Sequence, residues 1–208
     1  MLARLRLAKR MLAVGLAGLL AGLSSACRTA APPPAPPPEL FGLIERFLPQ
    51  FDGARERAGQ PPLARQDAER FLAGATIERR WQLEQEREVL TAVVPVRFGK
   101  GSGQCRVTVA ALPGQNAIHS VTFQLSNLTD PALADDENHV IDAFVRQYGD
   151  PSDVDAPDID LVWRLAGGAL ALLSAQADDP TMTFALRPLS EVPADDALSD
   201  GGELRDHD

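Results

Sequence analysis

The spacing of hydrophobic and polar residues changes along this chain, and the changes separate helical from extended segments. From residue 39 to 48 and from 64 to 75, hydrophobic residues recur at the three- and four-residue spacing of an amphipathic helix. Pro49 ends the first helix, and Pro61-Pro62 introduce the second. We therefore expect two short helices, each with one face directed to a core.

From Thr76 the hydrophobic period falls to two, which is the spacing of strands that bury one face. Turn residues separate the segments, most clearly at Gly99–Gly103 and Pro113–Asn116. The four strands predicted in this part of the chain are 76–84, 90–98, 105–111 and 121–125.

A third helix is predicted from Asp130 to Tyr148. Asp130 is a favourable N-cap, Pro131 suits the first helical position, and Gly149 suits the end of the helix. An acidic loop is expected next, followed by a hairpin and one last strand. These last three predicted strands are 161–165, 169–175 and 181–186.

The order of these elements predicts the fold class. Consecutive strands joined by short loops have to pair antiparallel. The order α-α-β-β-β-β-α-β-β-β therefore predicts an α+β domain with a mainly antiparallel sheet and helices packed on one face. A β-sandwich, or a curled half-barrel with one packed helix, is the alternative. No internal repeat is convincing, although strand-helix-strand pieces could hide a weak duplication.

The first 26 residues have the three parts of a secretory signal peptide. Four basic residues lie within the first ten, an uncharged apolar run extends from Met11 to Leu23, and small residues precede Cys27. This run is shorter than the roughly 20 residues that cross a bilayer as a helix. We therefore expect a cleaved signal rather than an uncleaved anchor.

The segment 23–27, Leu-Ser-Ser-Ala-Cys, resembles the lipobox of bacterial lipoproteins, although leucine is commonest in that family where this chain has Ser24. The resemblance implies a diacylglycerol on Cys27, cleavage before it and acylation, as with palmitate, of the new N-terminus. Two or more acyl chains anchor a protein stably. Because Arg28 rather than aspartate follows, the resemblance favours the periplasmic face of the outer membrane over the inner membrane. Cleavage after Ala26 that leaves a soluble periplasmic protein is the alternative.

The rest of the chain divides by composition. Six prolines between residues 32 and 38 favour an extended polyproline II spacer. From residue 190 the chain is polar and acidic, as in a disordered tail. The predicted organisation is a signal peptide (1–26), a lipidated proline-rich linker (27–38), one globular domain (39–189) and an acidic tail (190–208).

The charge of the chain restricts its partners. The net charge is −9, and removal of the leader leaves sixteen basic against 29 acidic residues, a net charge of −13. So acidic a protein is repelled by phosphate backbones and anionic headgroups. We expect no nucleic-acid partner, and we expect the lipid on Cys27 to be the membrane contact.

Five aspartates in one predicted loop are the weak candidates for a metal site. Calcium takes six to eight oxygen ligands, but the glycine and closing glutamate of an EF-hand loop are missing, so a solvated loop is the favoured interpretation. The candidates are Asp150, Asp153, Asp155, Asp158 and Asp160.

Other motifs do not indicate catalysis. Gly99–Gly103 precedes a strand rather than the helix that a phosphate loop needs. His139 has Asp135 and Asp142 nearby, which is half a metal site at most. Cys105 lies in phase with the hydrophobic side of its strand, so it is expected to be buried and unreactive.

We therefore expect a non-catalytic, membrane-anchored envelope lipoprotein that makes protein–protein contacts in the periplasm, without a cofactor or metal. Either the helical segment 39–75 or an exposed sheet face is the expected contact surface. One alternative is a small-ligand-binding module with a pocket between the sheet and the helix 130–148. Another is an enzyme with a scattered site, which an acid converging with His119 or His139 in a pocket would favour.

Overall fold

The computed structural model describes residues 36–134, 137–156, 158–173 and 181–192. The predicted signal peptide, Cys27, most of the proline-rich segment and the chain beyond residue 192 lie outside these residues, as do the predictions made for them. Within the described part, no helix combines the length and the apolar character needed to cross a bilayer.

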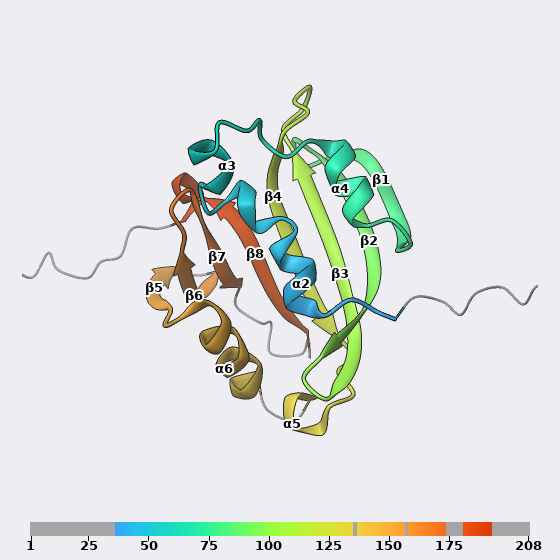
Figure 1. The fold of residues 1–208 in the computed structure, drawn as a ribbon, viewed down its shortest axis with the longest axis vertical. Helices are drawn as coiled ribbons and strands as arrows, with labels where there is room; N and C mark the ends of the chain where they lie inside the picture. The colour runs from blue at the N-terminus through green and yellow to red at the C-terminus, as the bar shows by residue number, and fades with distance from the viewer. Residues whose placement is uncertain (1–35, 135–136, 157, 174–180, 193–208) are drawn as a thin grey trace, which may run out of the picture. The chain divides into compact units, whose positions relative to one another are not determined.

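The described strands form one antiparallel eight-stranded sheet in the order β1-β2-β3-β4-β8-β7-β6-β5 (Figure 1). The predicted α+β class is confirmed, and the strands lie in one open sheet rather than in a sandwich. The bounds are β1 Thr76–Glu84, β2 Arg87–Phe98, β3 Gly101–Ala111, β4 Ile118–Ser126, β5 Ser152–Ala156, β6 Ile159–Arg164, β7 Gly168–Leu173 and β8 Met182–Pro188.

Strand β5 occupies the segment predicted to be an acidic loop, so the loop prediction is wrong there. Aspartate disfavours strands, which is why residues 152–156 gave no strand signal. Pairing with β6 overrides that preference, and β5 forms one edge of the sheet.

The helices lie on one side of the sheet, as predicted, with α2, α4 and α6 in front of it in Figure 1. The predicted helix 130–148 is present as two helices, with residues 135–136 between them outside the description. The helices are α2 Leu40–Glu45, α3 Ala54–Arg57, α4 Arg65–Phe71, α5 Pro131–Ala134 and α6 Glu137–Tyr148, with 3₁₀ turns η1 Leu48–Gln50 and η2 Leu189–Glu191.

Between the helices and the sheet lies one hydrophobic core. Strands β2, β3 and β4 contribute alternate residues, as the period of two predicted, and Cys105 is fully buried among them as expected. The fully buried large side chains include Leu40, Leu43, Ile44, Phe47, Leu90, Phe123, Leu125, Phe144, Leu170, Phe184 and Leu186.

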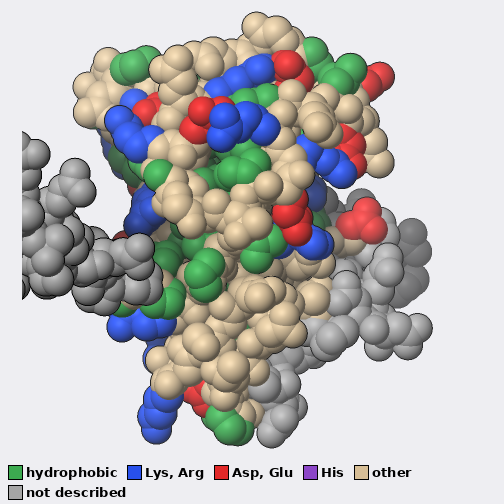
Figure 2. Space-filling model, turned by 90° about the vertical axis from the view of Figure 1, so that its right-hand side faces the viewer, with side chains coloured by type: hydrophobic (Ala, Val, Ile, Leu, Met, Phe, Trp, Pro, Cys, Tyr) green, Lys and Arg blue, Asp and Glu red, His purple; other side chains and the backbone are tan. Residues whose placement is uncertain are grey.

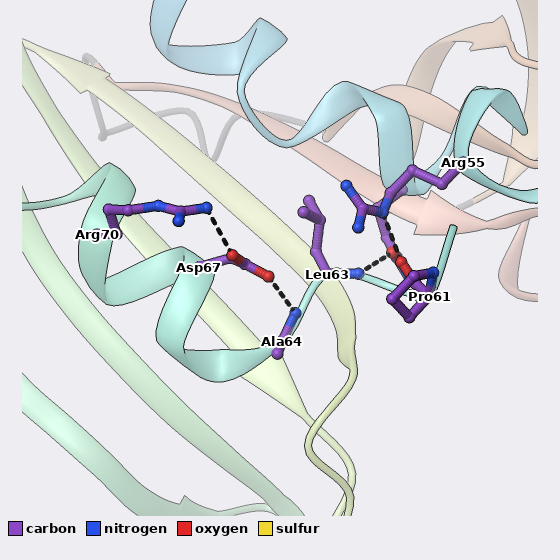
Figure 3. Close-up of polar contacts among 7 residues, drawn as sticks. Arg55, Pro61, Leu63, Ala64, Asp67 and Arg70 are labelled. Carbon is purple, nitrogen blue, oxygen red and sulfur yellow. Dashed lines mark hydrogen bonds and ion pairs between the residues drawn. The ribbon is translucent and has the colours of Figure 1, made fainter. Parts of the chain in front are cut away.

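The start of α4 is fixed by side-chain contacts (Figure 3). The Asp67 carboxylate accepts the Ala64 N–H at 2.9 Å and pairs with Arg70 at 2.7 Å. Alanine has no side-chain acceptor, so only this half of a capping box forms. The Leu63 N–H donates to Gln50 Oε1 at 2.7 Å, which ties the chain before α4 to η1.

The β2–β3 hairpin explains the glycine-rich segment 99–103. Phe98 pairs with Gly101, so Gly99 and Lys100 alone form the turn, which is shorter than the predicted loop. A Cβ on Gly101 would lie 2.6 Å from the Asp130 backbone nitrogen, and one on Gly103 would lie 2.7 Å from Leu128 Cδ2. These two glycines therefore allow the chain leading to α5 to cross β3 closely.

The order of elements repeats. Helices precede β1–β4 in the first half of the domain, and helices precede β5–β8 in the second. The last strands of the two halves pair with each other in the sheet, with Phe123 opposite Phe184, so the sheet order is the same from either edge. The two halves therefore share one topology, helices followed by four strands, which differs from the strand-helix-strand pieces considered from the sequence.

Candidate functional site

The space between the sheet and α6 is filled by aromatic rings. Phe144 of α6 stacks on Phe184 of β8 with 3.8 Å between ring centroids, and Trp163 lies 5.9 Å from Phe144. All three side chains are buried. At this point of the described structure, where Phe144 faces β6 and β8, the rings fill the interface between α6 and the sheet.

The helical segment 39–75 also uses its hydrophobic residues internally. Phe47 packs edge-on against Phe71 and Phe123, and Ala68 and Leu72 are buried. The hydrophobic residues of this segment therefore belong to the core, and its outer face is polar.

On the side of β1, β2 and β3 away from the helices lies a hollow of about 740 Å³. We call this side the open face. Alternate residues of β2 and β3, such as Thr91 and Thr108, point to it because their neighbours along each strand belong to the core. The charged residues that line it are Glu78, Arg79, Glu84, Arg87 and Arg106.

Ion pairs cross the open face. Arg106 Nε lies 3.0 Å from Glu78 Oε2, and Arg79 pairs with Glu84. Side chains in these pairs are 39–51% exposed. Exposed pairs of this kind contribute only about 0–1 kcal/mol each, so a partner can exchange them for its own charges at little cost.

Two hydrophobic side chains stand out at the edge strand β1. Leu83 is 70% exposed and Ile77 is 37% exposed, although both alternate with polar residues along the strand, as the partly buried Trp81 does. Their cross-strand partners are Glu88 and Ala92, so they lie on the helix side of β1. Figure 2, which faces the side where β1 and α4 lie in Figure 1, shows hydrophobic side chains among arginines and acids.

The backbone around Trp81 explains why this alternation does not bury Ile77 and Leu83. Trp81 has a φ of 40° and lies within the register shift between Arg79 and Gln82. The irregular backbone carries the indole towards α4, where its Nε1–H donates to Glu69 at 2.8 Å and the Arg65 guanidinium lies 5.1 Å from the ring. Helix α4 thus contacts Trp81, whereas Ile77 and Leu83 on the same strand remain exposed.

His119 does meet an acid, but one that the sequence placed in the tail. His119 Nε2 lies 2.6 Å from Glu191 Oε1, and Arg87 contacts the same carboxylate at 2.8 Å. Burial raises the pKa of Glu191, but the hydrogen bond from His119 and the charge of Arg87 outweigh it and hold the pKa below its usual value. Neither His119 nor Glu191 is among the residues that line the hollow.

The same C-terminal segment covers part of the second half of the sheet. Val192 is buried with Ile159 and Val162 in a small second cluster. The cluster also includes Ala169 and Ala171 of β7. The Glu191 contacts therefore hold η2 against the sheet as a structural clasp.

The five candidate calcium ligands are not gathered by the described structure. Asp150, Asp158 and Asp160 are exposed, and the side chains of Asp153 and Asp155 lie outside the description. In the part of the chain that the structure describes, no group of three His, Cys, Asp or Glu side chains is placed to hold a metal ion.

Cys105 has no accessible chemistry. Burial raises the pKa of its thiol to about 12, so it stays protonated. A disulfide with Cys27 would require the core to open around it, since the side chain is fully buried.

A second groove, of about 450 Å³, lies between α2, the β2–β3 hairpin, α5 and α6. Phe41 and Phe98 contribute rings to it, and Lys100, His139 and Arg146 contribute basic side chains. Sequence reasoning singled out His139 but not the other two, because residues this far apart in sequence are joined only by the fold.

No protein-family model, curated protein or solved structure matches this chain. The function is therefore argued from the surfaces described above.

Proposed function

We propose that this protein is a membrane-anchored bacterial envelope lipoprotein whose domain is a non-catalytic protein-binding module. Lipidation of Cys27 is supported by the signal-peptide pattern and the lipobox-like segment before it. The domain binds an envelope protein partner in the periplasm through the open face, at the periplasmic side of the outer membrane.

The observation that carries the proposal is the open face itself. Helices cover the opposite side of the sheet and bury its hydrophobic residues, whereas the open face holds an accessible hollow lined by both signs of charge. Its exposed ion pairs leave donors and acceptors available to a partner of complementary charge pattern. Specific protein interfaces combine such polar positions with hydrophobic contacts.

Leu83 and Ile77 lie on the helix side of the edge strand β1, and they supply the hydrophobic part of the interface where the partner reaches around that edge. They are two of the three large hydrophobic side chains that are exposed among the described residues. The edge itself is poorly suited to strand addition, because β1 has two register shifts and carries Arg80 and other charged side chains. The partner is therefore expected to contact side chains of the open face and edge rather than add a strand.

Photo-crosslinking in whole cells tests the binding surface. A photoreactive residue at Gln85, which lines the hollow, should capture one specific envelope protein. The same residue at Gln66, which is exposed on α4, is the matched control and should not capture it. Equal capture from both positions, or none from Gln85, would contradict the proposal.

The anchor is tested separately. Growth with labelled palmitate should label the protein, and Cys27→Ala should abolish the label and release the domain from the membrane. If the label persists in the variant, the lipoprotein part of the proposal is wrong even where the crosslink is found.

A further inference from the structure

The second groove combines a hydrophobic floor with a charged rim. The Phe41 and Phe98 rings meet edge-on with centroids 5.6 Å apart, and Ala143 of α6 presents only a methyl group beside them. A volume of about 450 Å³ falls within the range of small-molecule sites in proteins. The groove therefore has room for a small organic molecule with a hydrophobic body.

The acidic residues of the groove already have partners. Glu39 pairs with Arg97 at 3.0 Å. The Asp130 carboxylate accepts the backbone N–H groups of Lys100 at 2.8 Å and Ala132 at 3.1 Å. Both carboxylates thus already accept hydrogen bonds or an ion pair from groups other than the Lys100 and Arg146 side chains.

The side chains of Lys100 and Arg146, two of the basic residues of the groove, have no such partners among the described residues. Among the described residues, neither the Lys100 ammonium group nor the Arg146 guanidinium takes part in a hydrogen bond or ion pair. Acidic residues outnumber basic ones in this chain, and most of its described arginines contact a carboxylate or a carbonyl oxygen. Two unpaired cations at one groove therefore leave charged hydrogen-bond donors available to an anion, beside the carboxylates of Glu39 and Asp130.

We infer that this groove binds a small organic carboxylate with an aromatic or branched hydrophobic body. The body lies on Phe41 and Phe98, and the carboxylate lies between Lys100 and Arg146, where arginine can donate two parallel hydrogen bonds. A monoanion suits two cations that stand beside two carboxylates better than a dianionic phosphate does. The site lies on the helix side and shares no lining residue with the hollow of the open face.

Isothermal titration calorimetry of the full mature chain tests the inference. The binding of 4-phenylbutyrate is compared with that of its neutral isostere, 4-phenylbutanol. The carboxylate should bind saturably and the alcohol roughly tenfold more weakly or worse, because the alcohol lacks the charge-assisted hydrogen bonds. Equal binding of both compounds, or no saturable binding of the carboxylate in the millimolar range, would overturn it.

Variants locate the site. Lys100→Gln with Arg146→Gln should weaken 4-phenylbutyrate binding by roughly tenfold or more, because both charged donors are lost. Arg80→Gln is the matched control, since Arg80 is exposed on β1 and likewise has no contact among the described residues. An unchanged affinity in the double variant, or an equal loss in the control, would refute the assignment.

Ala143→Leu tests the groove without changing a charge. The larger side chain should fill the floor and abolish binding while the melting temperature stays near that of the parent chain. Full binding by a folded Ala143→Leu variant would place the ligand elsewhere and overturn the inference. Because the crosslink from Gln85 concerns another face, either proposal can fail without the other.

Discussion

The two halves of the sheet share an order of elements but differ in charge and strand length. Residues 39–129 carry eleven basic and ten acidic side chains, whereas residues 130–189 carry three basic and twelve acidic ones. Strands β1–β4 have 9 to 12 residues, and β5–β8 have 5 to 7. The acidic character of the chain therefore belongs to the second half and the tail, and the first half is nearly neutral.

This difference matches what each half presents. The long first-half strands carry the hollow and its balanced ion pairs on the face away from the helices. On the second half, η2 and Val192 pack beside small hydrophobic residues of β7. One topology thus supports an exposed polar face in one half and a covered hydrophobic face in the other.

The largest expected effect concerns whether the halves fold as one unit. Phe123 and Phe184 face each other across the central β4–β8 pair and are both fully buried. We expect Phe123→Ala and Phe184→Ala each to lower the free energy of unfolding by about 3–5 kcal/mol. Urea unfolding followed by fluorescence and by circular dichroism should show one coincident transition in each variant. Separate transitions would mean that the halves are independent units.

A smaller effect is expected where the first-half hairpin meets the connection between the halves. In Gly101→Ala the new Cβ would lie 2.6 Å from the Asp130 backbone nitrogen, so one segment has to shift. This overpacking should lower the free energy of unfolding by about 1–3 kcal/mol. Gly42→Ala is the matched control, because nothing lies within 4 Å of its new Cβ in helix α2. It should stabilise the domain by about 0.5–1 kcal/mol. Destabilisation by Gly42→Ala equal to that by Gly101→Ala would contradict the close crossing.

The clasp between the halves should depend on pH. Glu191 joins η2 to Arg87 and His119 of the first half, and its pKa is lowered in the folded state. A lowered pKa stabilises the fold above the unfolded value of about 4.3, and this contribution is lost as pH falls through the folded pKa. Glu191→Gln should therefore cost less than about 1 kcal/mol at neutral pH, given the partial exposure of these groups.

Measurement of unfolding at two pH values checks this assignment. The difference between the parent chain and Glu191→Gln should shrink as the pH is lowered through the folded pKa of Glu191, because the carboxylate then becomes protonated. Glu84→Gln breaks an exposed pair within the first half and serves as the comparison. A stability difference for Glu191→Gln that does not change with pH would show that the clasp does not depend on ionisation.

Much of the fold could be predicted from periodicity, because alternation along β2, β3 and β4 directly reflects one buried face. The same rule failed at β1, where register shifts around Trp81 interrupt the alternation and Leu83 and Ile77 remain exposed. It missed β5 because two aspartates alternate there and only pairing with β6 makes the strand. The local spacing of hydrophobic residues does not predict where a strand becomes irregular or which segment pairs with a neighbouring strand.

The candidate surfaces were less predictable than the fold. The polar residues in phase on β2 and β3, such as Thr91 and Arg106, were the available signal for an open face. The clasp could not be found, because it joins Glu191 to a histidine 72 residues earlier. The groove of Lys100 and Arg146 likewise exists only once α6 lies beside the β2–β3 hairpin.

The smallest effect on stability, and the sharpest test of the two halves as surfaces, is expected from two exposed leucines. Leu83 is 70% exposed at the first-half edge, and Leu189 is 39% exposed in η2. Replacement of either by serine should change the free energy of unfolding by no more than about 1 kcal/mol, since neither fills the core. Leu83→Ser should nevertheless reduce the crosslink from Gln85, and Leu189→Ser should leave it unchanged.

This pair separates binding from folding because both variants lose the same hydrophobic side chain. If the partner contacts the first half, only Leu83→Ser should reduce capture, although both variants lose the same hydrophobic side chain. Equal loss of capture in both variants would extend the contact surface to η2 and remove the functional distinction between the halves. Unchanged capture in both would leave the partner bound by the polar hollow alone, because Leu83 would then contribute nothing to the interface.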